Sequence, residues 1–255
     1  MYNKRDVIAR DLTGTGKTLA FCLPLVERFR KQGYFQSQEG TRCIILAPTR
    51  ELVIQVSKQL EQLKHSRNEF RVATIYGGVS YTPQIHAISS GVEFIVATTG
   101  RLLDLMNSNE TKFKKVDAVI LDEADRILDM GFQKDVEYIL NEVESQSEKK
   151  PQIILFSATV PGWVRDIARN HLDADHLYVD LVRSLKNKTA KSVEHFSVQW
   201  EASDKIDSLV DLLSVHFKPD CKIIVFTETK AEATRVAASP AFHKKSQFEG
   251  GITLE

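Results

Sequence analysis

Two polar segments of the chain contain residue types that suit chemistry on a phosphate group. The first, Gly14-Thr15-Gly16-Lys17-Thr18, joins a short apolar segment to a helical pattern. Glycines in such a turn let backbone N–H groups point at phosphate oxygens, and the N-terminus of the following helix adds its dipole. Lys17 would reach the β- and γ-phosphates, and the Thr18 hydroxyl would ligate Mg²⁺. The alternative is an ordinary glycine-rich turn that caps a helix.

The second polar segment follows the apolar run of residues 116–121, which predicts a strand buried on both faces of a parallel sheet. The run ends in three carboxylates: Asp122, Glu123 and Asp125. Because ligands bind at the carboxyl ends of such strands, one carboxylate would hold Mg²⁺ and the next would orient a water. The alternative is an acidic helix N-terminus, where Asp and Glu are favoured anyway. The glycine-rich loop upstream favours a nucleotide site over an acidic helix N-terminus.

Composition describes an ordinary globular protein, with 42% hydrophobic and 27% charged residues. Lys+Arg and Asp+Glu both number 34, so any surface for nucleic acid must be local. Cys22, Cys43 and Cys221 are widely spaced, which favours reduced core thiols in an intracellular protein. No apolar run approaches the roughly 18 residues that a membrane span needs, so no membrane association is expected.

Apolar periodicity alternates between the strand and helix patterns, which predicts an α/β fold with a doubly wound parallel sheet. Helices are expected over residues 16–30, with a kink at Pro24, and over residues 50–64. The right-handed crossovers of such a fold bring the loops after the strands to one edge. Strands are expected at residues 7–9, 43–47, 71–76, 92–98, 116–121, 153–156 and 177–180.

The pattern changes after Asp180, where a basic stretch with little apolar content suits an exposed linker. A second α/β pattern then predicts strands Val193–Gln199 and Lys222–Phe226 and helices over residues 204–216 and 230–238. We therefore expect a lobe over residues 1–182, a linker over 183–192, and a partial second lobe with an irregular tail over 193–255. Because the first strand begins near residue six, a preceding segment is expected to be missing.

Four further loops fall at the same predicted edge of the sheet. Taken singly, each is a common helix start with a Thr or Ser cap. Together their hydroxyls, backbone N–H groups, Arg50 and Arg101 suit a nucleic-acid backbone rather than bases. The loops are Pro48-Thr49-Arg50-Glu51-Leu52, Gly77-Gly78, Thr98-Thr99-Gly100-Arg101 and Ser157-Ala158-Thr159.

These motifs, in this order, resemble those of the DEAD-box ATP-dependent RNA helicases, over residues 6–238. Ile223–Phe226, followed by Glu228-Thr229-Lys230, resembles the first motif of the family's second RecA-like lobe. Within the family, Pro161–Val164 and Lys188-Thr189-Ala190, followed by Val193-Glu194-His195, are similar to the Gu-type nucleolar RNA helicases. The motif set is very specific for the family and less so for the subgroup.

The resemblance implies an ATP-binding RecA-like lobe and a truncated second RecA-like lobe, which together use ATP to close on RNA and separate a short duplex. Asp122 and Thr18 would hold Mg²⁺, Glu123 would position the attacking water, and Asp125, Ser157 and Thr159 would couple hydrolysis to lobe closure. The ATP phosphates would be bound by Thr13, Gly14, Thr15, Gly16, Lys17 and Thr18. The RNA backbone would be contacted, with little sequence preference, by Thr49, Arg50, Gly78, Thr98 and Arg101.

The subgroup resemblance further implies ribonucleoprotein or ribosome-assembly partners and a place in the nucleus or nucleolus. Without that subgroup resemblance, a cytoplasmic protein would be the expectation.

The sequence also departs from the family pattern. Asp11 stands where the phosphate loop usually begins with Ala or Gly, and we expect its charge to weaken nucleotide binding. Thr99 stands where the family has proline. The adenine-reading glutamine motif lies upstream of the first residue, and no His-Arg-x-Gly-Arg-x-x-Arg pattern occurs.

Two functional classes therefore stay open: an ATP-dependent RNA helicase represented by an incomplete chain, and a catalytically inactive RNA- or nucleotide-binding remnant that competes with the full-length enzyme. A P-loop ATPase of another family is disfavoured by the Pro-Thr-Arg-Glu-Leu and Ser-Ala-Thr motifs.

Overall fold

The computed structural model describes residues 4–12, 14–37, 40–108, 113–182, 193–194, 196–199, 205–216 and 222–240. The chain divides into two compact units, Met1–Thr189 and Ala190–Glu255. Within the part of the chain that is described, no helix has the length and apolar content needed to cross a bilayer.

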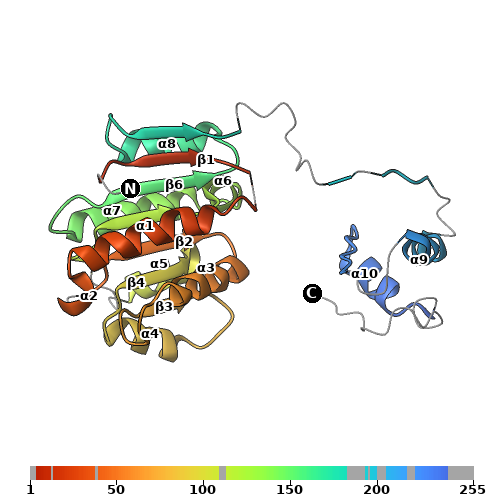
Figure 1. The fold of residues 1–255 in the computed structure, drawn as a ribbon, viewed down its shortest axis with the longest axis horizontal. Helices are drawn as coiled ribbons and strands as arrows, with labels where there is room; N and C mark the ends of the chain where they lie inside the picture. The colour runs from red at the N-terminus through yellow and green to blue at the C-terminus, as the bar shows by residue number, and fades with distance from the viewer. Residues whose placement is uncertain are drawn as a thin grey trace. The chain divides into compact units, whose positions relative to one another are not determined.

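A seven-stranded parallel sheet forms the centre of the first unit, with the strand order β3-β4-β2-β5-β6-β1-β7 (Figure 1). This order confirms the doubly wound α/β fold and brings β1, β5 and β6, from distant parts of the chain, side by side. The strands are β1 (Val7–Arg10), β2 (Cys43–Ala47), β3 (Val72–Ile75), β4 (Phe94–Thr98), β5 (Ala118–Leu121), β6 (Gln152–Ser157) and β7 (Leu177–Asp180).

Helices cover both faces of this sheet and enclose two hydrophobic cores. Strand β5 contributes to both, because Val119 and Leu121 face one core while Ala118 and Ile120 face the other. One face is covered by α1 (Lys17–Lys31), α2 (Tyr34–Ser37) and α3 (Arg50–Gln62). The other is covered by α4 (Tyr81–Ser89), α5 (Thr99–Asn107), α6 (Ala124–Asp129), α7 (Gln133–Gln146) and α8 (Gly162–His171).

Helix α1 begins directly after Gly16 and continues through Pro24 to Lys31 as one element. The proline therefore does not end the helix. Gly16 has φ 92°, a left-handed conformation that favours glycine, and this turn changes the chain direction between β1 and α1.

The second unit contains α9 (Lys205–His216) and α10 (Lys230–Ala237), which share a small core around Val210 and Leu213. The prediction of strands at Val193–Gln199 and Lys222–Phe226 was wrong for the residues that the structure describes, since none of them is in a strand. A strand needs a hydrogen-bonded neighbour, and no strand of the described chain pairs with these segments. Phe226 is accordingly 91% exposed rather than buried.

Candidate active site

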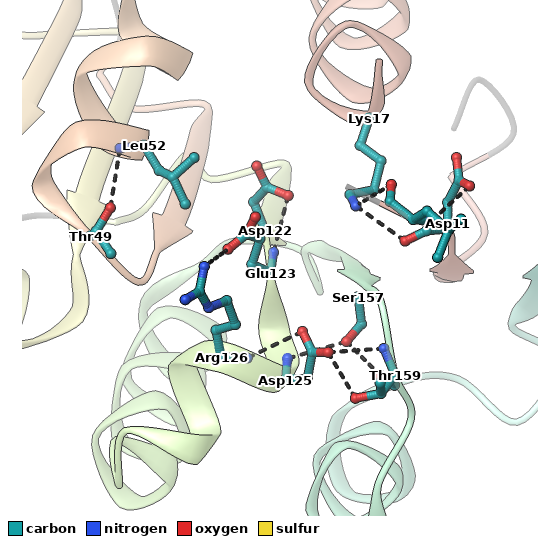
Figure 2. Close-up of polar contacts among 11 residues, drawn as sticks. Asp11, Lys17, Thr49, Leu52, Asp122, Glu123, Asp125, Arg126, Ser157 and Thr159 are labelled. Carbon is teal, nitrogen blue, oxygen red and sulfur yellow. Dashed lines mark hydrogen bonds and ion pairs between the residues drawn. The ribbon is translucent and has the colours of Figure 1, made fainter. Parts of the chain in front are cut away.

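Hydrogen bonds among its own residues fix the conformation of the glycine-rich loop between β1 and α1. Lys17 is the first residue of α1 and is buried, and its Nζ donates to the carbonyl oxygens of Asp11 (3.1 Å) and Leu12 (2.8 Å) (Figure 2). The Thr15 hydroxyl donates to the same Leu12 oxygen at 2.9 Å. Thr13 lies outside the described residues. The loop carbonyls therefore gather around the Lys17 ammonium group.

The backbone of Gly14 and Gly16 gives this loop its shape. Both have positive φ values, 80° and 92°, and a Cβ atom built on either would meet nothing within 4 Å. Glycine is thus required by the backbone conformation, and the space beside the loop is open. Among the described residues, the N–H groups of Gly14, Thr15 and Gly16 have no acceptor. Free N–H groups before a helix N-terminus are the chemistry that binds a phosphate.

Asp11, at the start of this loop, turns its carboxylate to the backbone. Its oxygen Oδ1 accepts a hydrogen bond from the N–H of Leu12 at 2.8 Å, and its own N–H donates to the Ser157 carbonyl at 3.1 Å. The neighbouring Arg10 pairs with Asp180 at 3.2 Å. Within the described chain, no cation forms an ion pair with the Asp11 carboxylate.

Asp122 follows β5 directly, so the buried strand delivers its carboxylate to the carboxyl edge of the sheet. The residue is only 3% exposed, and Oδ1 accepts the Glu123 N–H at 3.0 Å. Burial raises the pKa of Asp122 to about 6, with a further increase from the charge of Glu123. The charge of Lys17 and the hydrogen bond from Glu123 oppose this increase. A cation bound beside this carboxylate would favour its ionised form.

The donor set at this edge fits Mg²⁺. The Asp122 carboxylate and the Thr18 hydroxyl are hard oxygen ligands, which Mg²⁺ prefers. Among the residues that the structure describes, no group of three or more His, Cys, Asp or Glu side chains is placed to hold a metal ion. Such a sparse set suits Mg²⁺ bound to a nucleotide, because phosphate oxygens and waters then supply the other ligands.

Glu123 has a strained backbone. Its φ of 50° and ψ of 49° are left-handed, and Lys4 is the other non-glycine residue with positive φ in the described chain. Strain of this kind costs about 1–3 kcal/mol and is concentrated at functional sites. The Glu123 carboxylate lies 3.5 Å from the Arg126 guanidinium, on the first turns of α6 (Figure 2).

Asp125, Ser157 and Thr159 form one hydrogen-bonded cluster that joins α6 to the loop after β6 (Figure 2). Asp125 Oδ2 accepts from the Thr159 hydroxyl at 2.7 Å and from the Thr159 N–H at 2.9 Å. The Ser157 hydroxyl accepts the Asp125 N–H at 3.2 Å and donates to the Thr159 carbonyl at 2.6 Å. Burial alone would raise the pKa of Asp125, but these hydrogen bonds outweigh it and lower that pKa.

The loops after β2 and β4 place further polar groups at this edge. The Thr49 hydroxyl accepts the Leu52 N–H at 3.3 Å and so caps α3. Arg50 is exposed, and its guanidinium lies 4.8 Å from the centre of the Tyr76 ring. Thr98 is the N-cap residue of α5, but its hydroxyl makes no capping hydrogen bond.

Arg101 lies differently from Arg50. It is only 8% exposed, and both terminal nitrogens donate to the Val79 carbonyl at 3.1 Å. Its guanidinium stacks 3.9 Å from the centre of the Tyr81 ring. Gly78, whose φ is 82°, lies in the same loop as Val79. Arg101 therefore contacts protein groups in this structure, and its contact with the RNA backbone stays a prediction.

Sequence reasoning missed Gln84, a buried residue of α4 that bonds the backbone of the loop before it. The available signal was its position four residues before the buried Ile88, which puts a polar side chain on the buried side of the helix.

Comparisons with known proteins identify the family. Residues 1–167 match the family model described as DEAD/DEAH box helicase. Over 249 residues the chain is 38% identical to the ATP-dependent RNA helicase DDX50 of Homo sapiens, covering 97% of this chain and 33% of that protein. It is 36% identical over 247 residues to the nucleolar RNA helicase 2-A of Xenopus laevis, covering 96% and 32%. The chain thus spans about a third of the length of these relatives.

Solved structures show the same fold. A DEAD box protein from the hyperthermophile Methanococcus jannaschii has a TM-score of 0.63 and 34% identity, covering 92% of this chain and 59% of that one. Mss116p bound to ssRNA and AMP-PNP has a TM-score of 0.62 and 33% identity, covering 70% and 37%. With the family model matching most of the chain and the sheet of its first unit RecA-like, the chain belongs to the DEAD/DEAH box helicase family.

Proposed function

We propose that the first unit binds ATP with Mg²⁺ and contacts RNA, as the ATP-binding lobe of an ATP-dependent RNA helicase. The observation that carries this proposal is the convergence of three features on one sheet edge: the glycine-rich loop with Lys17, the buried Asp122, and the cluster of Asp125, Ser157 and Thr159. The names of the relatives, which include ATP-dependent RNA helicases, support it.

Each residue at this edge has a role in the proposal. The N–H groups of residues 13–16 and the Lys17 ammonium bind phosphate oxygens, with Lys17 exchanging its contacts to loop carbonyls for contacts to the ligand. Thr18 and Asp122 hold Mg²⁺, which when bound neutralises charge on the phosphates. Glu123, fixed by its left-handed backbone, orients the attacking water.

The cluster of Asp125, Ser157 and Thr159 links the site to the rest of the lobe. Ser157 ends β6, and its carbonyl accepts the Asp11 N–H while its hydroxyl accepts the Asp125 N–H, so the end of β6 contacts both the start of the glycine-rich loop and α6. A shift of the glycine-rich loop on nucleotide binding would therefore change the position of Thr159. This connection is the basis for proposing that the cluster couples hydrolysis to lobe closure.

RNA binding in the proposal uses Thr49, Arg50, Gly78, Thr98 and Arg101. These are contacts to the sugar-phosphate backbone, so binding should be salt-sensitive and show little sequence preference. The structure of a relative with ssRNA supports RNA as the nucleic acid.

We also assign residues 1–182 to the ATP-binding lobe, 183–192 to a linker and 193–255 to part of a second lobe. The name of the nucleolar relative supports nucleolar localisation. The resemblance to the same subgroup is the basis for proposing ribonucleoprotein partners.

A second candidate is binding of RNA and nucleotide without turnover by these 255 residues. The observation that favours it is the absence of a His-Arg-x-Gly-Arg-x-x-Arg pattern from the sequence. Arginines that cancel charge on the transferred phosphoryl group are worth about 10³–10⁵ in rate in P-loop enzymes. Without such arginines, the proposed site would bind its ligands but release phosphate at a rate near background.

Two assays on the 255-residue chain test the proposal. Fluorescence anisotropy with labelled oligouridine should show binding in low salt that weakens as salt increases. Phosphate release from ATP should stay near background with and without RNA. RNA-stimulated phosphate release that is lost in Glu123→Gln would refute the second candidate and support catalysis. A chain that binds neither ATP nor RNA would overturn the proposed function.

A further inference from the structure

The second unit exposes an apolar stretch of chain, residues 222–228, which we call the apolar segment. Within it Ile224 is 79% exposed and Phe226 is 91% exposed. Val225, between them, is 41% exposed, and Ile223 packs against the small core of the unit. Neighbouring side chains thus face opposite ways, which is the period of an extended strand.

The backbone of the apolar segment has no partner of its own. Residues 222–227 lie outside every helix and strand. Among the residues that the structure describes, none forms a hydrogen bond with a backbone N–H or C=O group of residues 223–227. An extended, apolar stretch with a free row of such groups is a template for pairing with another strand.

The two ends of the apolar segment carry opposite charges, Lys222 and Glu228. Both side chains are exposed, and their even numbers place them on the same face as the two most exposed apolar side chains. In the described part of the second unit, an ion pair joins Lys205 to Glu232 at 2.7 Å, and neither Lys222 nor Glu228 takes part in one. The segment is therefore an apolar strip with a free cation at one end and a free anion at the other.

This arrangement of charge is complementary to itself. When the apolar segment pairs with a second copy in the antiparallel direction about Val225, Lys222 of each copy lies opposite Glu228 of the other. Ile224 then lies opposite Phe226, and opposite side chains of such a pair are in contact on one face. Parallel pairing in register would instead place like charges side by side, which is unfavourable.

We propose that the apolar segment is a dimerisation surface, through which two copies of this chain pair as antiparallel β-strands about a two-fold axis. Each copy presents the same surface to the other, as a two-fold interface requires. A two-stranded pairing is marginally stable by itself, so we expect a weak dimer with a dissociation constant on the order of 100 µM. Neither ATP nor RNA takes part, so this dimer is independent of the proposed function.

Sedimentation velocity of the 255-residue chain, from about 10 µM to about 1 mM, measures the monomer–dimer equilibrium. We expect Phe226→Ser to weaken the dimer about tenfold or more, because each copy loses an apolar cross-strand pair. Phe196→Ser is the matched control, since Phe196 is an 84% exposed phenylalanine of the same unit outside the apolar segment. This control should dimerise like the wild type.

Exchange of the end charges tests the antiparallel register. Lys222→Glu alone and Glu228→Lys alone each replace two attractive pairs with two repulsive pairs, so each should weaken the dimer about tenfold. In an equimolar mixture of these two variants, every end charge meets an opposite charge on the other chain. The mixture should therefore dimerise like the wild type, which also shows that both variants are folded.

Four results would overturn the proposal. They are a wild-type chain that stays monomeric at about 1 mM, single charge variants that dimerise like the wild type, a mixture that stays monomeric, and species larger than a dimer that grow with time. Equal loss of association in Phe196→Ser and Phe226→Ser would overturn it as well, because the contact would then be a general apolar one rather than strand pairing.

Discussion

Replacing Asp122 by Asn should stabilise the fold while removing the proposed Mg²⁺ ligand. The Asp122 pKa is raised from 3.8 to about 6, mainly because the carboxylate is buried. A group whose folded-state pKa is raised destabilises the fold when ionised, so stability is lost as the pH rises through this range. This increase in pKa lowers the free energy of unfolding by about 3 kcal/mol at pH 7.5 and by about 1 kcal/mol at pH 4.5. Asn keeps the oxygen that accepts the Glu123 N–H.

Urea unfolding at the two pH values measures this effect. Tryptophan fluorescence in a Trp200→Phe background would report on Trp163 of the first unit. We expect Asp122→Asn to raise the free energy of unfolding by about 3 kcal/mol at pH 7.5 and by much less at pH 4.5. Asp129→Asn, an exposed position on α6, is the control and should change it by less than about 0.5 kcal/mol. A gain that is absent at pH 7.5, or equal at both pH values, would refute the reasoning.

Three further predictions concern other features of the first unit. Asp11→Ala should tighten ATP binding about fivefold or more, because like charges 4 Å apart repel by about 1 kcal/mol even in water. Calorimetry measures this affinity, and an unchanged value would show that the carboxylate lies away from the phosphates. Thr99→Val should raise the free energy of unfolding by about 1 kcal/mol in urea, since the Thr99 hydroxyl is buried and has no hydrogen-bond partner among the described residues; a decrease would contradict this. Limited proteolysis should leave a fragment near residues 1–190, because the two large cores lie in the first unit; a full-length chain that resists cleavage would argue against it.

The sequence predicted those parts of the site that depend on local pattern. The apolar run before Asp122 indicated a buried strand, and the strand delivers that carboxylate to the sheet edge as expected. The order of the motifs then placed Asp125 and Ser157 on the same edge, where they are hydrogen-bonded. Parallel strands impose this convergence, so it could be inferred without coordinates.

Contacts between distant segments could not be predicted in this way. Arg101 has the residue type of a phosphate contact, but its burial depends on Val79 and Tyr81, which lie about twenty residues earlier in the chain. The predicted strand Lys222–Phe226 has the right apolar content, yet strand formation depends on a neighbouring strand rather than on composition.

Binding of Mg²⁺-ATP by the wild-type chain and by Lys17→Ala tests the central claim most directly. The account predicts that a fluorescent ATP analogue binds the wild-type chain in the presence of Mg²⁺. Loss of a charge-assisted contact should weaken binding by Lys17→Ala about 10- to 100-fold. Lys31→Ala makes the same change at the other end of α1 and should bind like the wild type. Equal affinity of Lys17→Ala and the wild type, with both folded, would contradict the assignment of this sheet edge as a nucleotide site.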